Sequence, residues 1–569
     1  MALGFVTPNT FLPNTVADAN QVNANFLAIE VALNAGPPAG ALVATSDLSA
    51  LNWYNFFNFG ALVNGGSVTN GTAFATMLAT MAALNNGSGG GIAYLPAGSF
   101  PIAPGPGSGY VIPIQTVFQG AGATVANSGD GKGGPAQTML SMVGDGTLLF
   151  GFEPHTSGGV YFRNIAFGCQ NPLLPTTTCI NSNLWNLVAE DCVFEGWPTA
   201  MVVGLQAGAR GCTFHYGGNL SGCQQVIFSN PECFVIGPGE AYQNAIGNDG
   251  GPLGNSFLSL QGTEHSIVSF QHIFHWQYGI DYSQSSQQNR YNQYTNLEMA
   301  IFSTAVRMVP STSAGLIYSE KFTSCIIHKE DDATDGLPVV QIDANGGAST
   351  NINDIEFNGC TVFSDAPTPQ ANQYIYEIGV CSDWRIIGGY AGNSSPNGGA
   401  AIAITGQCGD GLIMGTNLTP SLPNAENPSA AQYAVLVKAA PIGTVYVIGA
   451  NMRGYSTPIY STVGSAINLR VINCPGYNDA PGGTIITSRM PTSGVSFSAQ
   501  TAGLTPYYGP ATIEVTGGTI TAIKFSQAPI PPATASYTSP LTSGTFDLSP
   551  GQYCTIYYTG SPTFVMVGR

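Results

Sequence analysis

Charged side chains are scarce in this sequence. Asp, Glu, Lys and Arg make up 8% of the 569 residues, against roughly 25% in an average globular protein. Lys and Arg together number 14 and Asp and Glu number 31, so the formal net charge is −17. This balance argues against binding to nucleic acid or to an anionic membrane surface, and it disfavours a highly anionic polysaccharide as a ligand.

Long apolar runs are missing too. No run of 18 apolar residues occurs, so we expect no membrane-spanning helix and no membrane insertion. The first residues, Met-Ala-Leu-Gly-Phe-Val-Thr-Pro, contain neither a basic stretch nor an apolar stretch typical of a signal peptide. We therefore expect no signal peptide, and we expect the chain to be made and assembled in a cytoplasm.

Motifs for several common chemistries are absent as well. The 12 cysteines include no Cys-x-x-Cys pair and no Cys/His grouping at zinc spacing, so we expect no metal site and no cofactor. A Gly-x-Ser-x-Gly nucleophile elbow and a phosphate-binding loop ending in Lys-Ser/Thr are also missing. Paired carboxylates are the chemistry that remains open to this chain.

Several cysteines recur in one local context. The four examples are Asp191-Cys192-Val193-Phe194, Gly211-Cys212-Thr213-Phe214, Ser324-Cys325-Ile326-Ile327 and Gly359-Cys360-Thr361-Val362. In a strand, a cysteine and the residue two positions on point to the same side. The pattern favours reduced thiols stacked in an interior, with a disulfide framework as the alternative. The spacings of 20 and 35 residues predict the lengths of two repeats.

Glycine and apolar residues are plentiful, with 73 glycines and 44% hydrophobic residues. Between residues 92 and 475, short apolar segments alternate with Gly, Asn and Ser turns. This composition favours stacked strands with tight turns, as in a solenoid, and it argues against a helical bundle. We expect on the order of a dozen repeats in this region.

The most specific pattern lies in residues 59–102. It contains Phe-Gly-Ala at 59–61, Asn-Gly at 64–65, Thr-Asn-Gly-Thr-Ala at 69–73 and a Gly-rich strand with Pro96 and Gly98. This order resembles the start of the pectate-lyase-like superfamily, in which acidic residues usually stand at the positions of Asn64, Asn70 and Gly71. The resemblance implies an all-β fold, a right-handed parallel β-helix that begins near Ile92. Because Asn and Gly replace the acidic residues here, the resemblance predicts the fold but does not decide whether the protein is an enzyme.

A helix is predicted at residues 72–84, between these motifs. Thr72 is a candidate N-cap, and apolar residues recur at helical spacing at Phe74, Met77, Leu78, Met81 and Leu84. The first rung of a β-helix exposes an unpaired edge and an open core. We therefore expect this amphipathic helix to cap it.

Residues 1–36 are predicted to form a separate helical module. Thr15 and Asp18 suit a capping box, and a two-heptad apolar seam follows at Ala19, Val22, Phe26, Ile29 and Leu33. Residues 14–26 also resemble the amino-terminal segments of bacteriophage tail proteins, which implies attachment to the virion tail or baseplate. A solvent-facing helix with one apolar stripe is the alternative.

The predicted domains are therefore a virion-attachment helix at 1–36, a linker and capping segment at 37–91, the β-helix at 92–475 and a C-terminal β-domain at 476–569. In the last domain, residues 512–523 predict a hairpin, and residues 544–567 predict antiparallel strands. Such a domain would cover the last open rung and hold chains together as a homotrimer.

Residues 264–298 form the densest cluster of aromatic, amide and acidic side chains. Glu264, Asp281 and Glu298 lie 17 residues apart, close to a short repeat, so they are predicted to stack on one outer face as candidate catalytic carboxylates. Sugar-binding candidates lie among them, because aromatic faces stack on sugars and polar groups bond hydroxyls. They are His275, Trp276, Tyr278, Tyr282, Arg290, Tyr291 and Tyr294.

Together these features resemble a bacteriophage tailspike or tail fibre protein. The resemblance implies a homotrimer in the virion tail that binds bacterial surface polysaccharide and depolymerises it by hydrolysis or β-elimination. A structural or receptor-binding spike without enzymatic activity is the first alternative. A secreted cellular lyase is the second, and the missing signal peptide weighs against it.

Overall fold

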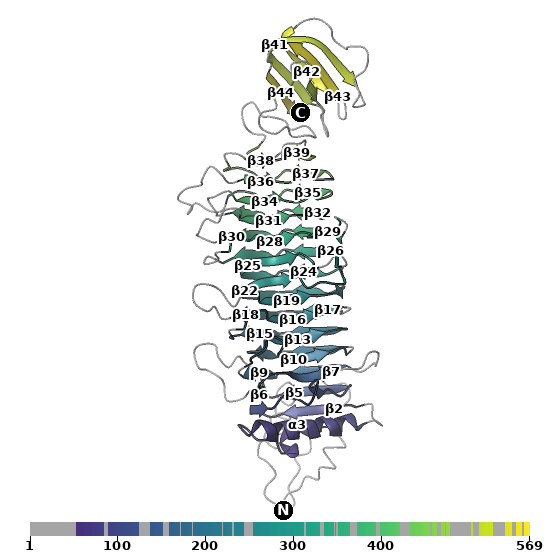
Figure 1. Ribbon diagram of the computed structural model, residues 1–569, viewed down its shortest axis with the longest axis vertical. Coiled ribbons are helices and arrows are strands. Elements are labelled where there is room, and N and C mark those ends of the chain that lie inside the picture. Colours follow the sequence, from purple (N-terminus) through teal and green to yellow (C-terminus); the bar gives the residue numbers. More distant parts are fainter. Residues whose placement is uncertain are drawn as a thin grey trace, which may run out of the picture.

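The computed structural model describes residues 53–84, 89–123, 137–151 and 159–477, with short gaps in the last range, and five strands between residues 502 and 568. The predicted module at 1–36 lies outside the described residues. Strands β1 to β39 pair in parallel, each with strands of the preceding and following rungs, and Figure 1 shows the rungs stacked along the long axis. The predicted parallel β-helix is confirmed.

One side of each rung belongs to a 17-stranded sheet, called face 1 here. Its strands are β1 (Trp53–Asn55), β2 (Gly91–Leu95), β5 (Thr116–Gly120), β8 (Val160–Arg163), β11 (Leu187–Glu190), β14 (Ala207–Arg210), β17 (Phe234–Ile236), β20 (Thr263–Glu264), β21 (Ile267–Ser269), β23 (Gln288–Arg290), β24 (Gln293–Thr295), β26 (Leu316–Thr323), β29 (Ile352–Asn358), β32 (Ser382–Ile387), β35 (Gly411–Met414), β37 (Val445–Ile448) and β39 (Leu469–Ile472).

A 22-stranded sheet supplies the other two sides. Face 2 consists of β3 (Gly98–Ile102), β6 (Thr138–Val143), β9 (Ala166–Gln170), β12 (Val193–Glu195), β15 (Cys212–Tyr216), β18 (Gly239–Gln243), β27 (Ile326–Lys329), β30 (Thr361–Ser364) and β33 (Tyr390–Asn393). Face 3 consists of β4 (Tyr110–Val111), β7 (Thr147–Gly151), β10 (Thr178–Ser182), β13 (Thr199–Val203), β16 (Gln224–Phe228), β19 (Ser256–Leu260), β28 (Val340–Ile342), β31 (Tyr374–Ile378), β34 (Ala400–Ile404), β36 (Tyr433–Val437) and β38 (Ile459–Ser461). The long strands β22 (Gln271–Asp281) and β25 (Glu298–Met308) bend from face 2 onto face 3, which joins the two faces into one sheet.

Left-handed residues turn the chain from face 1 to face 2. From β8 to β37 the corner residue has a positive φ in rung after rung, and Asn, Asp and Gly adopt this conformation most readily. The corner residues are Asn164, Asp191, Gly211, Gly237, Phe270, Asn296, Ser324, Gly359, Gly388, Gly415 and Gly449. The Gly, Asn and Ser turns of the sequence therefore have a fixed place in the fold.

The recurring cysteines come directly after these corners. Cys192, Cys212, Cys325 and Cys360 are buried with free thiols, and each thiol lies 3.4–3.5 Å from a main-chain carbonyl of the preceding rung. The interior position of these reduced thiols is confirmed. Their spacing also matches single rungs, because Val193 pairs with Thr213 and Ile326 pairs with Thr361.

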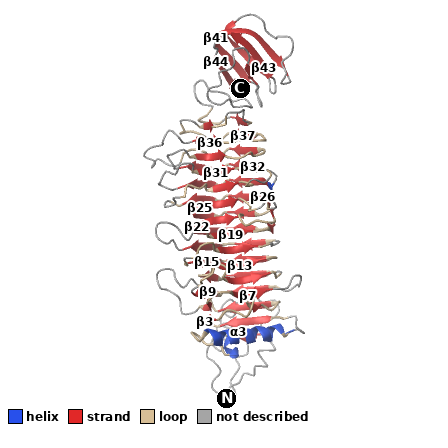
Figure 2. Ribbon diagram, in the orientation of Figure 1, coloured by secondary structure: helices blue, strands red, loops and turns tan. Residues whose placement is uncertain are grey.

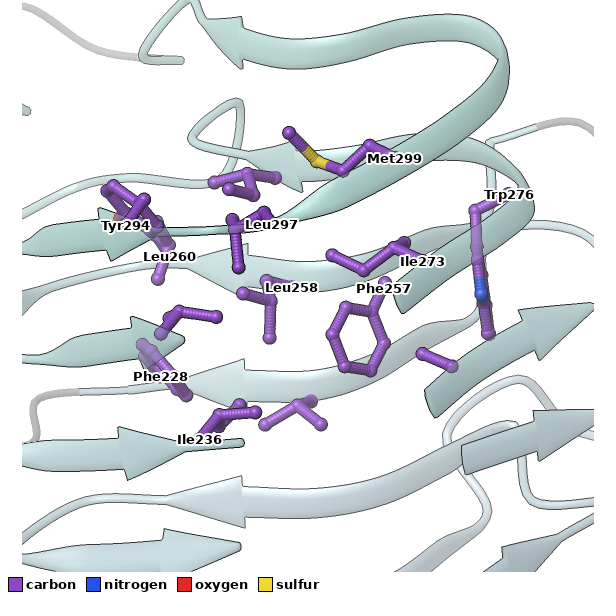
Figure 3. Close-up of a cluster of buried hydrophobic side chains, with 14 of the residues drawn as sticks. Phe228, Ile236, Phe257, Leu258, Leu260, Ile273, Trp276, Tyr294, Leu297 and Met299 are labelled. Atoms are coloured by element: carbon purple, nitrogen blue, oxygen red, sulfur yellow. The ribbon is translucent and has the colours of Figure 1, made fainter. Parts of the chain in front are cut away.

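Aromatic rings fill much of the interior and stack from rung to rung. Phe167, Phe194 and Phe214 form one stack, with ring centroids 5.3 and 5.1 Å apart. Figure 3 shows how side chains from the different faces meet in the middle of the rung. The stacking follows from parallel pairing, which places equivalent side chains about 4.8 Å apart.

The helix α3 (Ser67–Ala82) covers the first rungs, as predicted and as Figure 2 shows in blue. Phe74, Met77, Leu78 and Met81 are buried in it. It begins at Ser67, so the prediction of Thr72 as N-cap is wrong. Asn70 holds the earlier turn in place, because its side chain accepts from the Leu62 amide at 2.8 Å and donates to the Leu62 carbonyl at 3.0 Å.

The C-terminal strands form a five-stranded antiparallel sheet of β40 (Ala502–Leu504), β41 (Ala511–Ser526), β42 (Leu541–Leu548), β43 (Tyr553–Thr559) and β44 (Thr563–Gly568). The predicted antiparallel strands near 544–567 are confirmed. The predicted hairpin at 512–523 is wrong, because β41 continues through Gly517 and Gly518 as one strand with register shifts. The two glycines therefore accompany a bulge rather than a turn.

Candidate functional site

The three predicted carboxylates do not stack on one face. Glu264 belongs to β20 on face 1, whereas Asp281 and Glu298 belong to opposite ends of β22 and β25. Each rung here is 26 residues long, since Glu264 pairs with Arg290 and Asp281 with Arg307. The prediction of stacking at 17-residue intervals is therefore wrong.

Glu264 is part of a cluster on face 1 that also contains Arg290 and Tyr291. The Arg290 guanidinium lies 2.6 Å from the Glu264 carboxylate and 3.1 Å from the Tyr318 hydroxyl. The Tyr291 ring stacks on His265 with centroids 5.0 Å apart. We call these five residues the face 1 cluster. The Glu264 carboxylate is therefore engaged in an ion pair with Arg290.

Asp281 forms an ion pair on face 3. Its two carboxylate oxygens receive Arg307 Nε at 2.8 Å and Nη2 at 2.7 Å, and the Ser283 amide and hydroxyl donate to it as well. The Arg307 guanidinium lies 3.6 Å from the centroid of the Tyr278 ring. The Asp281 side chain is only 4% exposed, so its geometry is that of a structural ion pair.

Three of the predicted sugar-binding aromatic residues point into the core. Trp276 and Tyr282 are 0% exposed and Tyr294 is 1% exposed, and Figure 3 shows Trp276 and Tyr294 among the interior side chains. These side chains do not line the outer surface, so their prediction as surface groups is corrected. The physical reason for Trp276 is a pair of register shifts in β22, between Phe274 and Trp276 and between Trp276 and Tyr278, which breaks the alternation of the strand.

A strip of aromatic, imidazole and acidic side chains follows the outer surface of face 2. The strand register aligns one row across successive rungs, consisting of Glu195, His215, Tyr242, Phe274, Ala300, His328 and Phe363. A parallel row contains Thr213, Glu240, His272, Glu298, Ile326 and Thr361. We call these two rows the face 2 strip. Of the three predicted carboxylates, Glu298 is the one that belongs to this strip.

The rings of the strip contact one another along its length. His215 and Tyr242 stack with centroids 4.2 Å apart, and His328 and Phe363 stack at 5.0 Å with an interplanar angle of 5°. Between these pairs, His272 meets the Phe274 ring edge-on at 5.8 Å. The strip therefore offers accessible rings in two groups, Tyr242 with His272 and Phe274 and, beyond Ala300, His328 with Phe363, whereas His215 is only 3% exposed.

His275 lies at the bend from face 2 to face 3, beside this strip. Its backbone is left-handed, with a φ of 63°, and its ring centroid is 5.7 Å from that of Phe302. Its Nδ1 lies 3.5 Å from the Glu330 carboxylate. His275 is thus the one predicted sugar-binding residue that borders the face 2 strip.

Carboxylates flank the rings of the strip. Glu240 and Glu298 lie in the same row on either side of His272, and the Glu298 carboxylate lies 3.8 Å from His272 Nδ1. Burial raises the pKa of Tyr242, and the negative charges of Glu195 and Glu240 raise it further. Glu240 and Tyr242 were not predicted from the sequence, although both stand at outward positions of a strand.

A second acidic group that the sequence analysis missed is Glu320, in the interior. It is fully buried, its carboxyl group lies 2.6 Å from the Tyr282 hydroxyl, and it accepts a hydrogen bond of 2.8 Å from Asn292. Tyr282 and Tyr294 are joined at 2.7 Å. Burial raises the pKa of Glu320 to about 8, although the hydrogen bonds oppose this shift. Glu320 lies two residues before the buried Phe322, and in a strand this spacing places both side chains on the same side. This spacing was the sequence pattern that could have predicted the inward position of Glu320.

No group of His, Cys, Asp and Glu suited to a metal ion occurs in the part of the chain that the structure describes. Within the same residues, no helix has the length and apolar character needed to cross a membrane.

The fold and the face 2 strip define a parallel β-helix protein with an aromatic and acidic outer face. No family model matches the sequence, and no curated protein matches it. Solved structures do match in fold. A double mutant of the tailspike protein of E. coli bacteriophage HK620 aligns with a TM-score of 0.50 and 11% identity, covering 93% of this chain and 95% of that one.

Tailspike protein 3 of bacteriophage CBA120 aligns with a TM-score of 0.50 and 13% identity, covering 83% of this chain and 70% of that one. The A-module of a mannuronan C-5 epimerase from Azotobacter vinelandii aligns with a TM-score of 0.46 and 12% identity, covering 74% and 98%. At these identities the likeness to the two tailspike proteins shows the fold alone, a parallel β-helix.

Proposed function

We propose that this protein is a bacteriophage tail component that binds a bacterial surface polysaccharide along the face 2 strip. The observation that carries the proposal is the register-aligned row from Glu195 to Phe363, in which rings recur on both sides of Ala300 beside the carboxylates of the second row. Sugar rings present apolar C–H faces and a rim of hydroxyls, so rings beside hydrogen-bonding groups suit them. The length of the strip suits a polymer better than a small molecule.

We also propose how the protein assembles. The apolar seam at 19–33 supports attachment to the virion and association as a homotrimer, with the C-terminal β-domain at 476–569 as the second place where chains hold together. The scarcity of Lys and Arg supports a neutral or weakly acidic polysaccharide as the ligand. The protein would be assembled in the cytoplasm of the bacterial host and act in the virion tail.

Polysaccharide binding is tested by replacing a ring of the strip. The Tyr242→Ser variant is expected to bind roughly tenfold more weakly, because it removes the ring surface that Tyr242 presents beside His215. A panel of purified capsular and O-antigen polysaccharides is first screened for one that the parent protein binds. Binding titrations with that polysaccharide then compare the variant with the parent.

Tyr161→Ser is the matched control, since Tyr161 lies on face 1 beside Arg163. Its affinity for the polysaccharide should equal that of the parent. Equal affinities for parent and Tyr242→Ser would place the site away from the strip, and a parent that binds no polysaccharide of the panel would refute the proposal.

A second candidate function is cleavage of the bound polysaccharide. One observation favours it: Glu240 and Glu298 lie two rungs apart in one row, which corresponds to about 10 Å between their Cα atoms. Their side chains can adjust this separation to the roughly 6.5–9.5 Å that inverting glycosidases use. The ion pairs of Glu264 and Asp281 speak against those two carboxylates as the catalytic pair.

Cleavage is tested with the Glu298→Gln variant, which keeps the shape of the side chain and removes its proton transfer. If Glu298 is catalytic, the rate should fall about 10²-fold or more while binding is retained. Reducing ends report hydrolysis, and absorbance of unsaturated products reports β-elimination. Absence of both signals in the parent would leave a binding spike without enzymatic activity, and full activity in Glu298→Gln would exclude Glu298.

A further inference from the structure

Phe270 occupies a corner position where a bulky side chain is out of place. Its φ is 51°, and every other left-handed corner from β8 to β37 in the described chain carries Asn, Asp, Ser or Gly. A bulky residue in this conformation is an outlier, because its side chain crowds the backbone. Phe270 also gains little from packing, since it is 57% exposed. The fold alone therefore gives no reason for an aromatic residue here.

Tyr291 shows the same combination one rung on. Face 1 has its own series of left-handed residues where its strands bend, namely Cys233, His265, Tyr291, Ser319, Asp354 and Asp383. Tyr291 has a φ of 59° and is 43% exposed. Its ring rests on His265 at 5.0 Å and meets the edge of Tyr318 at 5.8 Å. Two exposed aromatic residues thus occupy unfavourable backbone positions in adjacent rungs.

These residues lie on one continuous path over the surface. Along the chain, His265 stands two residues before β21 and Phe270 directly after it, and Ile267 between them is 39% exposed. Directly after Phe270, the chain continues into β22 with His272 of the face 2 strip. The path therefore runs from the face 1 cluster, across β21, around the corner at Phe270 and onto face 2.

The polar groups beside the path suit an uncharged hydroxylated ligand. Arg290 is neutralised by Glu264 at 2.6 Å, so the cluster offers no free cation for a phosphate or a carboxylate. The Tyr318 hydroxyl bonds Arg290 at 3.1 Å and Gln288 at 3.2 Å, which fixes hydroxyl and amide groups next to the rings. Rings flanked by such groups match the mixed apolar and polar surface of a sugar.

We propose that Phe270 and Tyr291 form a second stacking platform, which extends the polysaccharide site around the corner from face 2 onto face 1. The inference rests on the proposed function, because it takes the same polysaccharide as its ligand. Backbone strain that persists at exposed positions often marks a functional site. Here the strain holds two rings outward, where sugar units beyond the face 2 strip would reach them.

The test combines affinity with stability in the full-length protein. In Phe270→Asn and Tyr291→Asn, each ring is replaced by a residue that tolerates the left-handed conformation. Both variants are expected to bind the polysaccharide identified with the panel roughly tenfold more weakly, while their melting temperatures equal or exceed that of the parent. Tyr291→Phe keeps the ring and should retain the affinity.

Ser324→Asn is the matched control, because it introduces the same residue at a corner of the same kind without removing a ring. It should leave the affinity for the polysaccharide unchanged.

The inference is overturned if Phe270→Asn and Tyr291→Asn bind as tightly as the parent while Tyr242→Ser binds more weakly. The proposed function then stands. Lower melting temperatures with unchanged affinity would indicate a structural role, and altered sedimentation with unchanged affinity a contact between copies of this chain. Either result contradicts the proposal that Phe270 and Tyr291 bind sugar. A parent that binds no polysaccharide refutes both proposals.

Discussion

Replacing Phe322 with Ala is expected to lower the free energy of unfolding by about 3–5 kcal/mol. Phe322 is 0% exposed and lies between Tyr294 and Phe357, with ring centroids 4.3 and 4.5 Å away and nearly parallel planes. Removing the middle ring leaves a cavity between two rungs. Parallel hydrogen bonds above and below hold the rungs at their spacing, so the walls cannot close the cavity.

Urea unfolding of the parent and of Phe322→Ala measures this loss. Ile326→Ala in the following strand is the control, because Ile326 is 46% exposed and its truncation should cost less than about 0.5 kcal/mol. Similar losses in both variants would contradict a core built from stacked rings.

The second large effect concerns Glu320 and pH. Because burial raises its pKa to about 8 in the folded chain, the folded protein keeps a proton that the unfolded chain releases near pH 4.5. The stability that this neutral carboxyl contributes is therefore complete below about pH 4.5, falls as the pH rises and is lost above about pH 8. The loss is on the order of 3–5 kcal/mol.

Glu320→Gln tests this pH dependence with little change of shape. The Gln amide group can hydrogen-bond the Tyr282 hydroxyl and accept from Asn292, the same two partners that the Glu320 carboxyl group has. The variant should match the parent at pH 5 and be more stable than the parent at pH 8.5, measured as urea midpoints. Parallel pH profiles for the two proteins would show that Glu320 does not titrate in this range.

The sequence revealed the fold through local chemistry. The Gly-rich strand near Ile92 and the apolar spacing in α3 depend only on neighbouring residues, so both could be predicted. The cysteines after the corners could also be placed inside, because Cys192 and Phe194 share one side of a strand. Such local patterns do not depend on the lengths of the loops between rungs.

The register could not be predicted in the same way. Rungs of 20 to 35 residues occur in one solenoid, so a spacing of 17 residues between Glu264 and Asp281 has no structural meaning. The bulges in β22 turn Trp276 inward, whereas Tyr278, two residues on, is partly exposed and lies against Arg307. The face 2 strip depends on pairings between distant segments, which no single stretch of sequence contains.

The most direct test of the central claim is a structure of the protein with an oligosaccharide prepared from the polysaccharide that it binds. The account predicts sugar rings on the outer surface of face 2, stacked against Tyr242 and Phe274 and within hydrogen-bond distance of Glu240 or Glu298. Sugar bound only on face 3, beside Asp281 and Arg307, or only at the C-terminal sheet would contradict it.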